Sequence, residues 1–220
     1  MSASGVPAAV LWDMDGTLID SEKLWDISLA DLAEHLGGRL GEAARRRMVG
    51  SNLDAAMLIM FEALDLEPEP DALGKAGNWL TERTGELFRD GLRWRPGARE
   101  ALASLLETGV PMALVTSTER ELTEVALNTI GREFFQVTVC GDEVEGRNKP
   151  HPEPYLKAAR LLGIDPGRCV AVEDSPVGMR SAIAAGCRVL VVPSEVPIPP
   201  GPGYVVRDSL DGEVPGTTSP

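Results

Sequence analysis

The hydrophobic and polar positions divide the chain into two regions with different periods. From residue 21 to about residue 90, apolar side chains recur three or four positions apart, first at Trp25, Leu29, Leu32 and Leu36. This spacing places them on one face of a helix, which the glycines at positions 37 and 38 end. Further helices are predicted near residues 55–63 and from about 71 to 88. The first region is therefore predicted to be an all-helical block.

From residue 94 onwards, short apolar runs alternate with amphipathic segments. The runs predict strands at 111–115, 135–140, 169–172 and 189–192, in addition to 8–12 ahead of the helical block. Helices are predicted between them at about 98–108, 154–162 and 176–185. Thr118 and Glu121 have capping-box spacing for one more helix. Such alternation is typical of a parallel sheet covered by helices on both faces. The predicted fold class is α/β, a Rossmann-like sheet interrupted after its first strand by the helical block.

Composition and charge narrow the classes of partner. The chain has 220 residues, of which 43% are hydrophobic and 25% charged, as in soluble globular proteins. The net charge of −13 argues against nucleic acid or an anionic membrane surface as the main partner, because both require a basic face. An anionic small molecule would have to be attracted by a local positive site, such as a metal ion, a lysine or backbone N–H groups.

The ends of the chain and its cysteines indicate a cytoplasmic protein. Residues 1–7 lack the basic and long apolar segments of a signal peptide, and no apolar run is long enough to span a bilayer. The three cysteines have no metal-binding spacing and are expected to be free thiols in a reducing compartment. Residues 193–220 are rich in proline and glycine, with a short element at 204–206, and residues 211–220 are predicted to be a disordered tail.

Two carboxylates directly follow the first apolar run. Asp13 and Asp15 lie one residue apart, and Gly16 then turns the chain. Like charges so close to an apolar segment are costly unless a cation neutralises them, and a bound metal would leave one carboxylate free to act as a nucleophile. Thr116 and the pair 173–174 also follow apolar runs, and the carboxyl ends of parallel strands meet at one edge of a sheet. The pattern favours phosphoryl transfer through an aspartyl phosphate.

Four separated segments resemble the motifs of the haloacid dehalogenase (HAD) superfamily, in its capped phosphatase and β-phosphoglucomutase-like branch. In chain order they are Asp13-Met14-Asp15-Gly16-Thr17, Val115-Thr116-Ser117, Lys149-Pro150-His151-Pro152-Glu153-Pro154-Tyr155 and Val172-Glu173-Asp174-Ser175-Pro176-Val177-Gly178. In this family the helical insertion is a mobile cap over an α/β core. The resemblance implies a core of residues 1–20 and 94–210 and a cap of residues 21–93.

The resemblance implies a role for each acidic residue at the strand ends. Asp13 is implied as the nucleophile, and Asp15 as the acid that protonates the leaving alkoxide and then takes a proton from water. Mg²⁺ is the implied cofactor, with carboxylate ligands from Asp13 and Asp174 and the backbone carbonyl of Asp15. Glu173 is implied either as a ligand through water or as an anchor for the ligands. Acids at 173 and 174 also suit the start of the helix that follows them.

Three further residues are implied at the phosphate. Lys149 would balance the negative charge between Asp13 and the phosphoryl oxygens, and the prolines around it stiffen its segment. The hydroxyl of Thr116 and the backbone N–H of Ser117 would donate to a phosphoryl oxygen. A helix-capping hydroxyl is the alternative interpretation of Thr116.

Cap residues would select the substrate, because a cap closes over the part of the ester that does not react. Trp25, Asn52 and Trp79 are candidates to line the pocket, although an aromatic residue on an amphipathic helix more often belongs to a hydrophobic core. The arginines at 45–47 either grip a second anion or form a solvated helix face.

The predicted activity is hydrolysis of a small organic phosphate monoester, such as a sugar or nucleotide-like phosphate, by a monomer or dimer. A sugar phosphomutase is the alternative. Mutases of this kind typically have a histidine early in the cap and an arginine in its substrate loop, where this chain has Trp25 and residues 50–54 without arginine. The presence of Asp15 disfavours a dehalogenase, because such enzymes replace this acid. A phosphorylated receiver domain is disfavoured because its accepting Asp follows a later strand.

Overall fold

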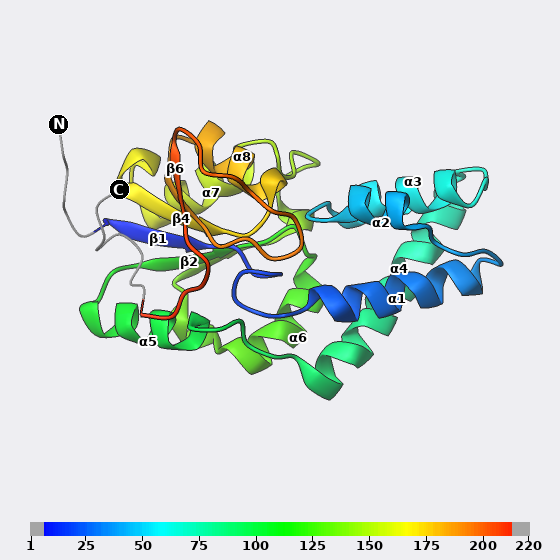
Figure 1. The fold of residues 1–220 in the computed structure, drawn as a ribbon, viewed down its shortest axis with the longest axis horizontal. Helices are drawn as coiled ribbons and strands as arrows, with labels where there is room; N and C mark the ends of the chain where they lie inside the picture. The colour runs from blue at the N-terminus through cyan, green and yellow to red at the C-terminus, as the bar shows by residue number, and fades with distance from the viewer. Residues whose placement is uncertain (1–6, 213–220) are drawn as a thin grey trace.

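In the computed structural model, which describes residues 7–212, a parallel sheet lies at the centre of the core and helices project from one end of it (Figure 1). The strands are β1 (Ala9–Trp12), β2 (Met112–Val115), β3 (Val137–Val139), β4 (Cys169–Glu173), β5 (Arg188–Val191) and β6 (Tyr204–Val206). They are ordered β3-β2-β1-β4-β5-β6, and every pair is parallel. The predicted Rossmann-like α/β fold is confirmed.

Each face of the sheet has its own hydrophobic cluster, because successive side chains of a strand point to opposite faces. Val10 and Trp12 pack on the side of α5 (Ala98–Thr108) and α6 (Arg120–Ile130). Ala9 and Leu11 pack on the side of α7 (Glu153–Leu162) and α8 (Pro176–Ala184), and the two helix pairs lie on opposite sides of the sheet in Figure 1. All four β1 residues are fully buried, so this strand is an uninterrupted apolar run in the sequence.

The parallel register brings the ends of three strands together. Val10 of β1 lies opposite Met112 of β2 and Val170 of β4. One residue beyond β1, the N–H of Asp13 still donates to the carbonyl of Val172 at 3.0 Å. The chain therefore leaves β1, β2 and β4 at the same edge of the sheet, the edge that faces the projecting helices (Figure 1).

Four helices between β1 and α5 form the cap. They are α1 (Glu22–His35), α2 (Glu42–Met48), α3 (Leu53–Ala63) and α4 (Pro70–Gly91). Leu32, Met60 and Leu80 belong to a third hydrophobic cluster that lies within these helices. A bridge between Ile19 and Trp94 joins the two connections to the core. The predicted all-helical insertion is confirmed, and its boundaries at 20/21 and 93/94 stay a prediction.

Local details differ from the sequence prediction. The predicted capping box at Thr118 is wrong, because α6 begins at Arg120 after an N-cap at Glu119 and the Thr118 hydroxyl bonds elsewhere. Helix α2 was not predicted as a separate helix; only Ala44 and Met48 of its 7 residues are buried, which leaves almost no periodic signal.

Other expectations concern the cysteines and the chain ends. The three cysteines are buried free thiols, as predicted. Of the predicted disordered tail, residues 213–220 lie outside the described residues, as do residues 1–6. Within residues 7–212, none of the helices has the length and apolar character needed to cross a bilayer.

Candidate active site

A cluster of three carboxylates and one lysine lies at the carboxyl edge of the sheet. Asp13 directly follows β1, while Glu173 ends β4 and Asp174 follows it. Oxygen atoms of these three carboxylates lie within 4.8 Å of one another, and all three side chains are buried. Lys149, from the loop before α7, reaches the same point. The structure thus brings together residues that are up to 161 positions apart, between 13 and 174 in the sequence.

Lys149 is fixed by three acceptors and an aromatic ring. Its Nζ donates to Asp13 Oδ1 at 2.7 Å, to Glu173 Oε1 at 2.7 Å and to the carbonyl of Val115 at 2.9 Å. The ring centroid of Tyr155 lies 5.2 Å from Nζ, within cation–π distance. Burial alone would lower the pKa of Lys149, but the charges of Asp13 and Glu173 outweigh it and raise the pKa. Lys149 is therefore a fixed cation.

Glu173 orients Lys149 and is itself held in place. The phenol of Tyr155 donates to Glu173 Oε1 at 2.5 Å, and the Ser175 hydroxyl donates to Oε2 at 3.3 Å. A Cβ at Gly178 would lie 1.9 Å from the Glu173 carboxylate, so the first turn of α8 needs a glycine there. The geometry favours the second sequence interpretation of Glu173, an anchor.

One lysine does not neutralise three carboxylates. Burial raises the pKa of Asp13 to about 7 in spite of Lys149. Burial, and then the charges of Asp13 and Glu173, raise the pKa of Asp174 well above its usual range. Asp13 Oδ2 is buried and has no hydrogen-bond partner among the described residues. A buried carboxylate oxygen without a partner, beside two further carboxylates, fits a hard divalent cation, which prefers oxygen ligands.

Asp174 is placed by a glycine turn and a loop after β5. The hydroxyl of Ser194 donates to Asp174 Oδ2. Gly16 has φ of +78°, and a Cβ there would lie 2.1 Å from the same oxygen. Only glycine fits at this position, because a side chain would displace the carboxylate. The glycine of the first motif is thus required for the close approach of Asp174 as well as for the turn.

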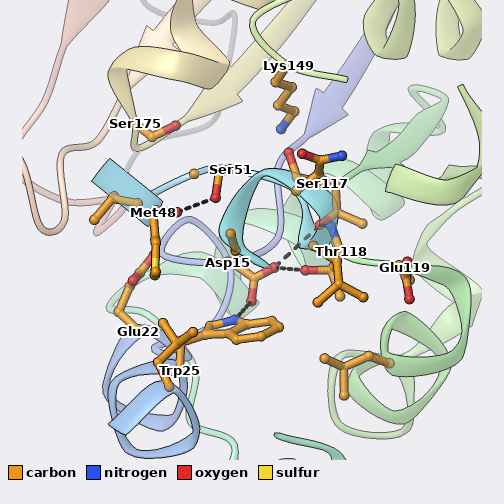
Figure 2. A pocket seen from close by; sticks show the side chains of 18 of the residues that line it. Asp15, Glu22, Trp25, Met48, Ser51, Ser117, Thr118, Glu119, Lys149 and Ser175 are labelled. Atoms are coloured by element: carbon orange, nitrogen blue, oxygen red, sulfur yellow. Dashed lines mark hydrogen bonds between the residues drawn. The ribbon is translucent and has the colours of Figure 1, made fainter. Parts of the chain in front are cut away.

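Asp15 faces the cap, and both of its oxygens are hydrogen-bonded. Oδ1 accepts from the Ser21 hydroxyl at 2.6 Å and from the Trp25 indole at 3.1 Å. Oδ2 accepts from the Thr118 hydroxyl at 2.7 Å and from that of Thr116 at 3.4 Å. Figure 2 shows Asp15 between Trp25 on the cap side and Lys149 on the core side. Cap and core therefore both contribute donors to one carboxylate.

Four of the remaining predicted residues, Trp25, Asn52, Thr116 and Ser117, line the pocket between cap and core. The prediction for Trp79 is wrong, because this ring lies outside that pocket and stacks on His35, with ring centroids 5.0 Å apart. Trp25 packs edge-on against Phe88, with ring centroids 6.1 Å apart, so this indole has a core contact as well as a pocket position. Asn52 caps α3 by accepting from the N–H of Ala55 at 3.3 Å. Thr116 Oγ1 accepts from the N–H of Thr118 at 3.0 Å, a bond within the loop before α6, whose N-cap is Glu119 and has no side-chain cap, so the helix-capping alternative for Thr116 does not hold. Ser117 lines the same pocket and is labelled near Thr118 in Figure 2.

Sequence reasoning missed four residues that hold these groups. They are Ser21, Thr118, Tyr155 and Ser194, which bond to Asp15, Glu173 or Asp174. Tyr155 belongs to the third motif, and its distance from Lys149 of six positions is the one sequence signal that pointed to it. The other three are ordinary hydroxyl residues in loops or near helix starts, where turn and capping roles are common.

The raised pKa values predict how metal stabilisation depends on pH. A carboxyl whose pKa is higher in the folded than in the unfolded state binds protons more tightly when folded. The metal-free protein therefore loses stability as the pH rises from about 4 to about 7, the range between the ordinary and folded pKa of Asp13. A divalent cation competes with those protons, so the rise in Tm on adding Mg²⁺ should be small near pH 5 and larger by several degrees near pH 8.

Thermal unfolding with and without a chelator measures this difference. The Asp174→Asn variant should lose the pH-dependent part of the Tm increase caused by Mg²⁺. Asp71→Asn, on the exposed start of α4, is the control and should keep it. A Tm increase that is equal at both pH values in the unchanged protein would contradict a metal bound by these carboxylates.

Comparisons with known proteins agree with this geometry. A chain from Thermotoga maritima named phosphorylated carbohydrates phosphatase is 35% identical over 179 residues, 81% of each chain. Hexitol phosphatase B of Escherichia coli K12 is 32% identical over 190 residues, 84% of this chain and 83% of that one. The structure of a CbbY mutant from Rhodobacter sphaeroides in complex with xylulose-1,5-bisphosphate matches with a TM-score of 0.84 and 28% identity, covering 93% of this chain and 95% of that one.

The sheet order, the helical insertion after β1 and the carboxylate–lysine cluster define a capped, Rossmann-like α/β protein with an acidic site at the carboxyl edge of its sheet. The profile of the haloacid dehalogenase-like hydrolases matches residues 10–192, and the chain belongs to that family. Within the family it is a phosphatase, a hydrolase of phosphoric monoesters.

Proposed function

We propose that this phosphatase is magnesium-dependent and hydrolyses a small organic phosphate monoester, a sugar or nucleotide-like phosphate, by transferring the phosphoryl group to Asp13. The observation that carries the proposal is the state of the Asp13 carboxylate. One oxygen is held by Lys149 at 2.7 Å, and the other is buried and has no hydrogen-bond partner within residues 7–212, in a carboxylate that lies beside Asp174. A carboxylate fixed on one side and free on the other is prepared for in-line attack on phosphorus.

Two displacements complete the reaction. In the first, an oxygen of Asp13 forms a bond to phosphorus while the bond to the ester oxygen breaks, and the leaving alkoxide takes a proton from Asp15. In the second, water attacks the phosphoryl group of Asp13, gives its proton to Asp15 and releases inorganic phosphate and the free carboxylate. Lys149 balances the charge on Asp13 and the phosphoryl oxygens throughout, because it stays protonated.

Mg²⁺ bound by Asp13, Asp174 and the backbone carbonyl of Asp15 would supply charge neutralisation for the incoming phosphoryl group. Glu173 acts as the anchor that holds Lys149 in place. Thr116 and the backbone N–H of Ser117 donate to a phosphoryl oxygen. Trp25 and Asn52 line the space that would hold the rest of the substrate. The names of the relatives support a sugar phosphate as the substrate, and a cytoplasmic monomer or dimer stays our expectation.

The proposal is tested by phosphate release from a panel of sugar, nucleotide and glycolate phosphates. We expect turnover of at least one sugar phosphate with Mg²⁺ and none after chelation, with activity restored by adding the ion back. Robust turnover in excess chelator would contradict the proposed mechanism. The mutase alternative predicts isomerised hexose phosphate when a hexose bisphosphate is added, so the same reactions are also analysed for isomers.

A further inference from the structure

The cap end of the pocket contains one ionic network that the proposed chemistry does not use. Arg45 of α2 donates through Nη2 to Glu22 Oε2 at 2.8 Å and through Nε to Asp26 Oδ1. Glu22 and Arg45 line the pocket, whereas Asp26 stands outside the set of residues that line it. The side chains of Glu22 and Arg45 are 9% and 17% exposed, and that of Asp26 is 49% exposed. One cation in the pocket wall is thus paired with two anions.

The neighbouring arginines do not add positive charge to the pocket. Arg46 pairs with Glu42 on the surface at 2.9 Å, and Arg47 pairs with Glu62 at 2.6 Å. Their side chains are 76% and 54% exposed, as a solvated helix face requires. The arginines at 45–47 had two interpretations, an anion grip and a solvated helix face. Arg46 and Arg47 form the solvated face, and of the three only Arg45 lines the pocket.

The charge of the pocket wall is unfavourable for a second phosphate. Among the described residues that line it there are five carboxylates, Asp13, Asp15, Glu22, Glu119 and Asp174, against two cations, Arg45 and Lys149. Lys149 is committed to Asp13 and Glu173. Burial, and then the charges of Asp142 and Asp54, raise the pKa of Glu119 in the same wall. A second phosphate would meet no uncompensated cation in this wall.

A hydroxyl group of a substrate can form hydrogen bonds with the Glu22–Arg45 pair in the same wall. Glu22 Oε1 accepts no hydrogen bond from the described residues, and Arg45 uses Nη2 and Nε but leaves the hydrogens of Nη1 available. The pair, which lines the pocket, therefore has one acceptor oxygen and one donor nitrogen that no described residue uses. A hydroxyl both donates and accepts, so it can bond to both groups, whereas a dianionic phosphate accepts from Arg45 and is repelled by Glu22. Burial raises the pKa of Glu22, with Arg45 opposing it, as expected for a carboxylate removed from solvent.

We propose that the cap end of the pocket binds the uncharged, hydroxyl-bearing part of a monophosphate and excludes a second phosphate. Glu22 and Arg45 bind a hydroxyl, and Asp26 cancels the charge that Arg45 would otherwise offer to an anion. This inference rests on the proposed function and narrows its substrate to the monophosphate of a polyol or a neutral sugar. A relative of the same fold was solved with a bisphosphate; the pocket of this chain rejects that class.

The test compares two substrates that differ at one end, a hexitol 6-phosphate and the corresponding hexitol 1,6-bisphosphate. We expect kcat/KM to favour the monophosphate by at least about 100-fold, because the second phosphate meets a network of two carboxylates and one guanidinium, whose net charge is negative. Asp26→Asn should reduce the ratio of the two kcat/KM values, monophosphate over bisphosphate, by about 5- to 10-fold. The reduction should come mainly from a lower KM for the bisphosphate, because Arg45 then has one anionic partner and can attract the second phosphate. Glu22→Gln should raise KM for the monophosphate and lower it for the bisphosphate.

Glu62→Gln is the matched control. It removes the carboxylate partner of a neighbouring arginine, Arg47, on the solvated side of the cap, and should leave the ratio unchanged. Asp26 is half exposed, so its amide variant is expected to fold. The inference is overturned if the unchanged protein cleaves the bisphosphate as efficiently as the monophosphate, or if Asp26→Asn and Glu62→Gln have the same effect on the ratio.

Binding separates this inference from the proposed function. The affinity of each compound for the Asp13→Asn protein with Mg²⁺ is measured by calorimetry, and the monophosphate should bind more tightly. If neither compound nor a generic aryl phosphate is hydrolysed, the proposed function fails, but tighter binding of the monophosphate still supports the inference. Equal or tighter binding of the bisphosphate overturns the inference even if the monophosphate is hydrolysed.

Discussion

Replacing Asp13 with asparagine is expected to reduce Mg²⁺-dependent phosphate release by about 10⁴-fold or more, because the amide oxygen is a poor nucleophile and cannot form the acyl phosphate. The same variant should be at least as stable as the unchanged protein in the absence of metal. Burial raises the pKa of Asp13 to about 7, so above that pH a charged oxygen without a partner is replaced by a neutral group. In Asp13→Asn, phosphate release should therefore fall, whereas the stability of the metal-free protein should stay the same or rise.

Phosphate release, thermal unfolding in chelator near pH 8 and acid trapping of the phosphorylated protein measure these effects. Trapping should label the unchanged protein and not the variant. Asp71→Asn is the control, because this exposed aspartate at the start of α4 lies outside the site, and it should behave as the unchanged protein in all three assays. Activity within tenfold of normal in Asp13→Asn, or labelling of that variant, would contradict the assignment of Asp13 as the nucleophile.

Replacing Lys149 with methionine is expected to lower the free energy of unfolding by about 3–5 kcal/mol near pH 8, as for other buried ion pairs that lose one partner. The variant leaves the carboxylates of Asp13 and Glu173 close together without their shared cation, and Glu173 keeps only neutral donors, the phenol of Tyr155 and the hydroxyl of Ser175, among the described residues. The loss should be smaller near pH 5, because Asp13 is then below its folded pKa of about 7 and binds a proton instead. Mg²⁺ should restore part of the lost stability.

Denaturant unfolding at the two pH values measures the loss. Lys23→Met is the control, since Lys23 is a surface cation with a side chain 78% exposed, 3.6 Å from Asp20, and its removal should cost less than about 1 kcal/mol. Equal losses for the two lysine variants would show that Lys149 is not a structural counterion of the site. Phosphate release by Lys149→Met should also fall steeply, because the charge that gathers on phosphorus has lost its fixed partner.

The sequence predicted the sheet and the convergence of its ends because both depend on patterns within the chain. Strands buried on both faces are unbroken apolar runs, and the residue after such a run lies at the carboxyl edge of a parallel sheet. The pattern alone therefore predicts that Asp13, Thr116, Glu173 and Asp174 lie at one edge of the sheet. Lys149 follows no strand, and its position came from the resemblance to a known motif.

Sequence patterns did not predict which residues hold another functional side chain in place. Thr118 has capping-box spacing, yet its hydroxyl donates to Asp15, more than a hundred positions away in the sequence, and the N-cap of α6 is Glu119. Arg45 lies in a run of three arginines, and only the rotation of α2 decides which of them faces the pocket. Such choices depend on tertiary geometry, which single-sequence periodicity does not describe.

The hydrogen bonds to Asp15 have a consequence for how such proteins diversify. Ser21 and Trp25 belong to the chain entering the cap, yet they orient an acid of the core. A cap transplanted from a homologue would import a new preference for substrates but would leave that acid without half of its donors. Productive recombination, natural or engineered, should therefore cross over beyond position 25, so that this first helical turn is inherited with the core.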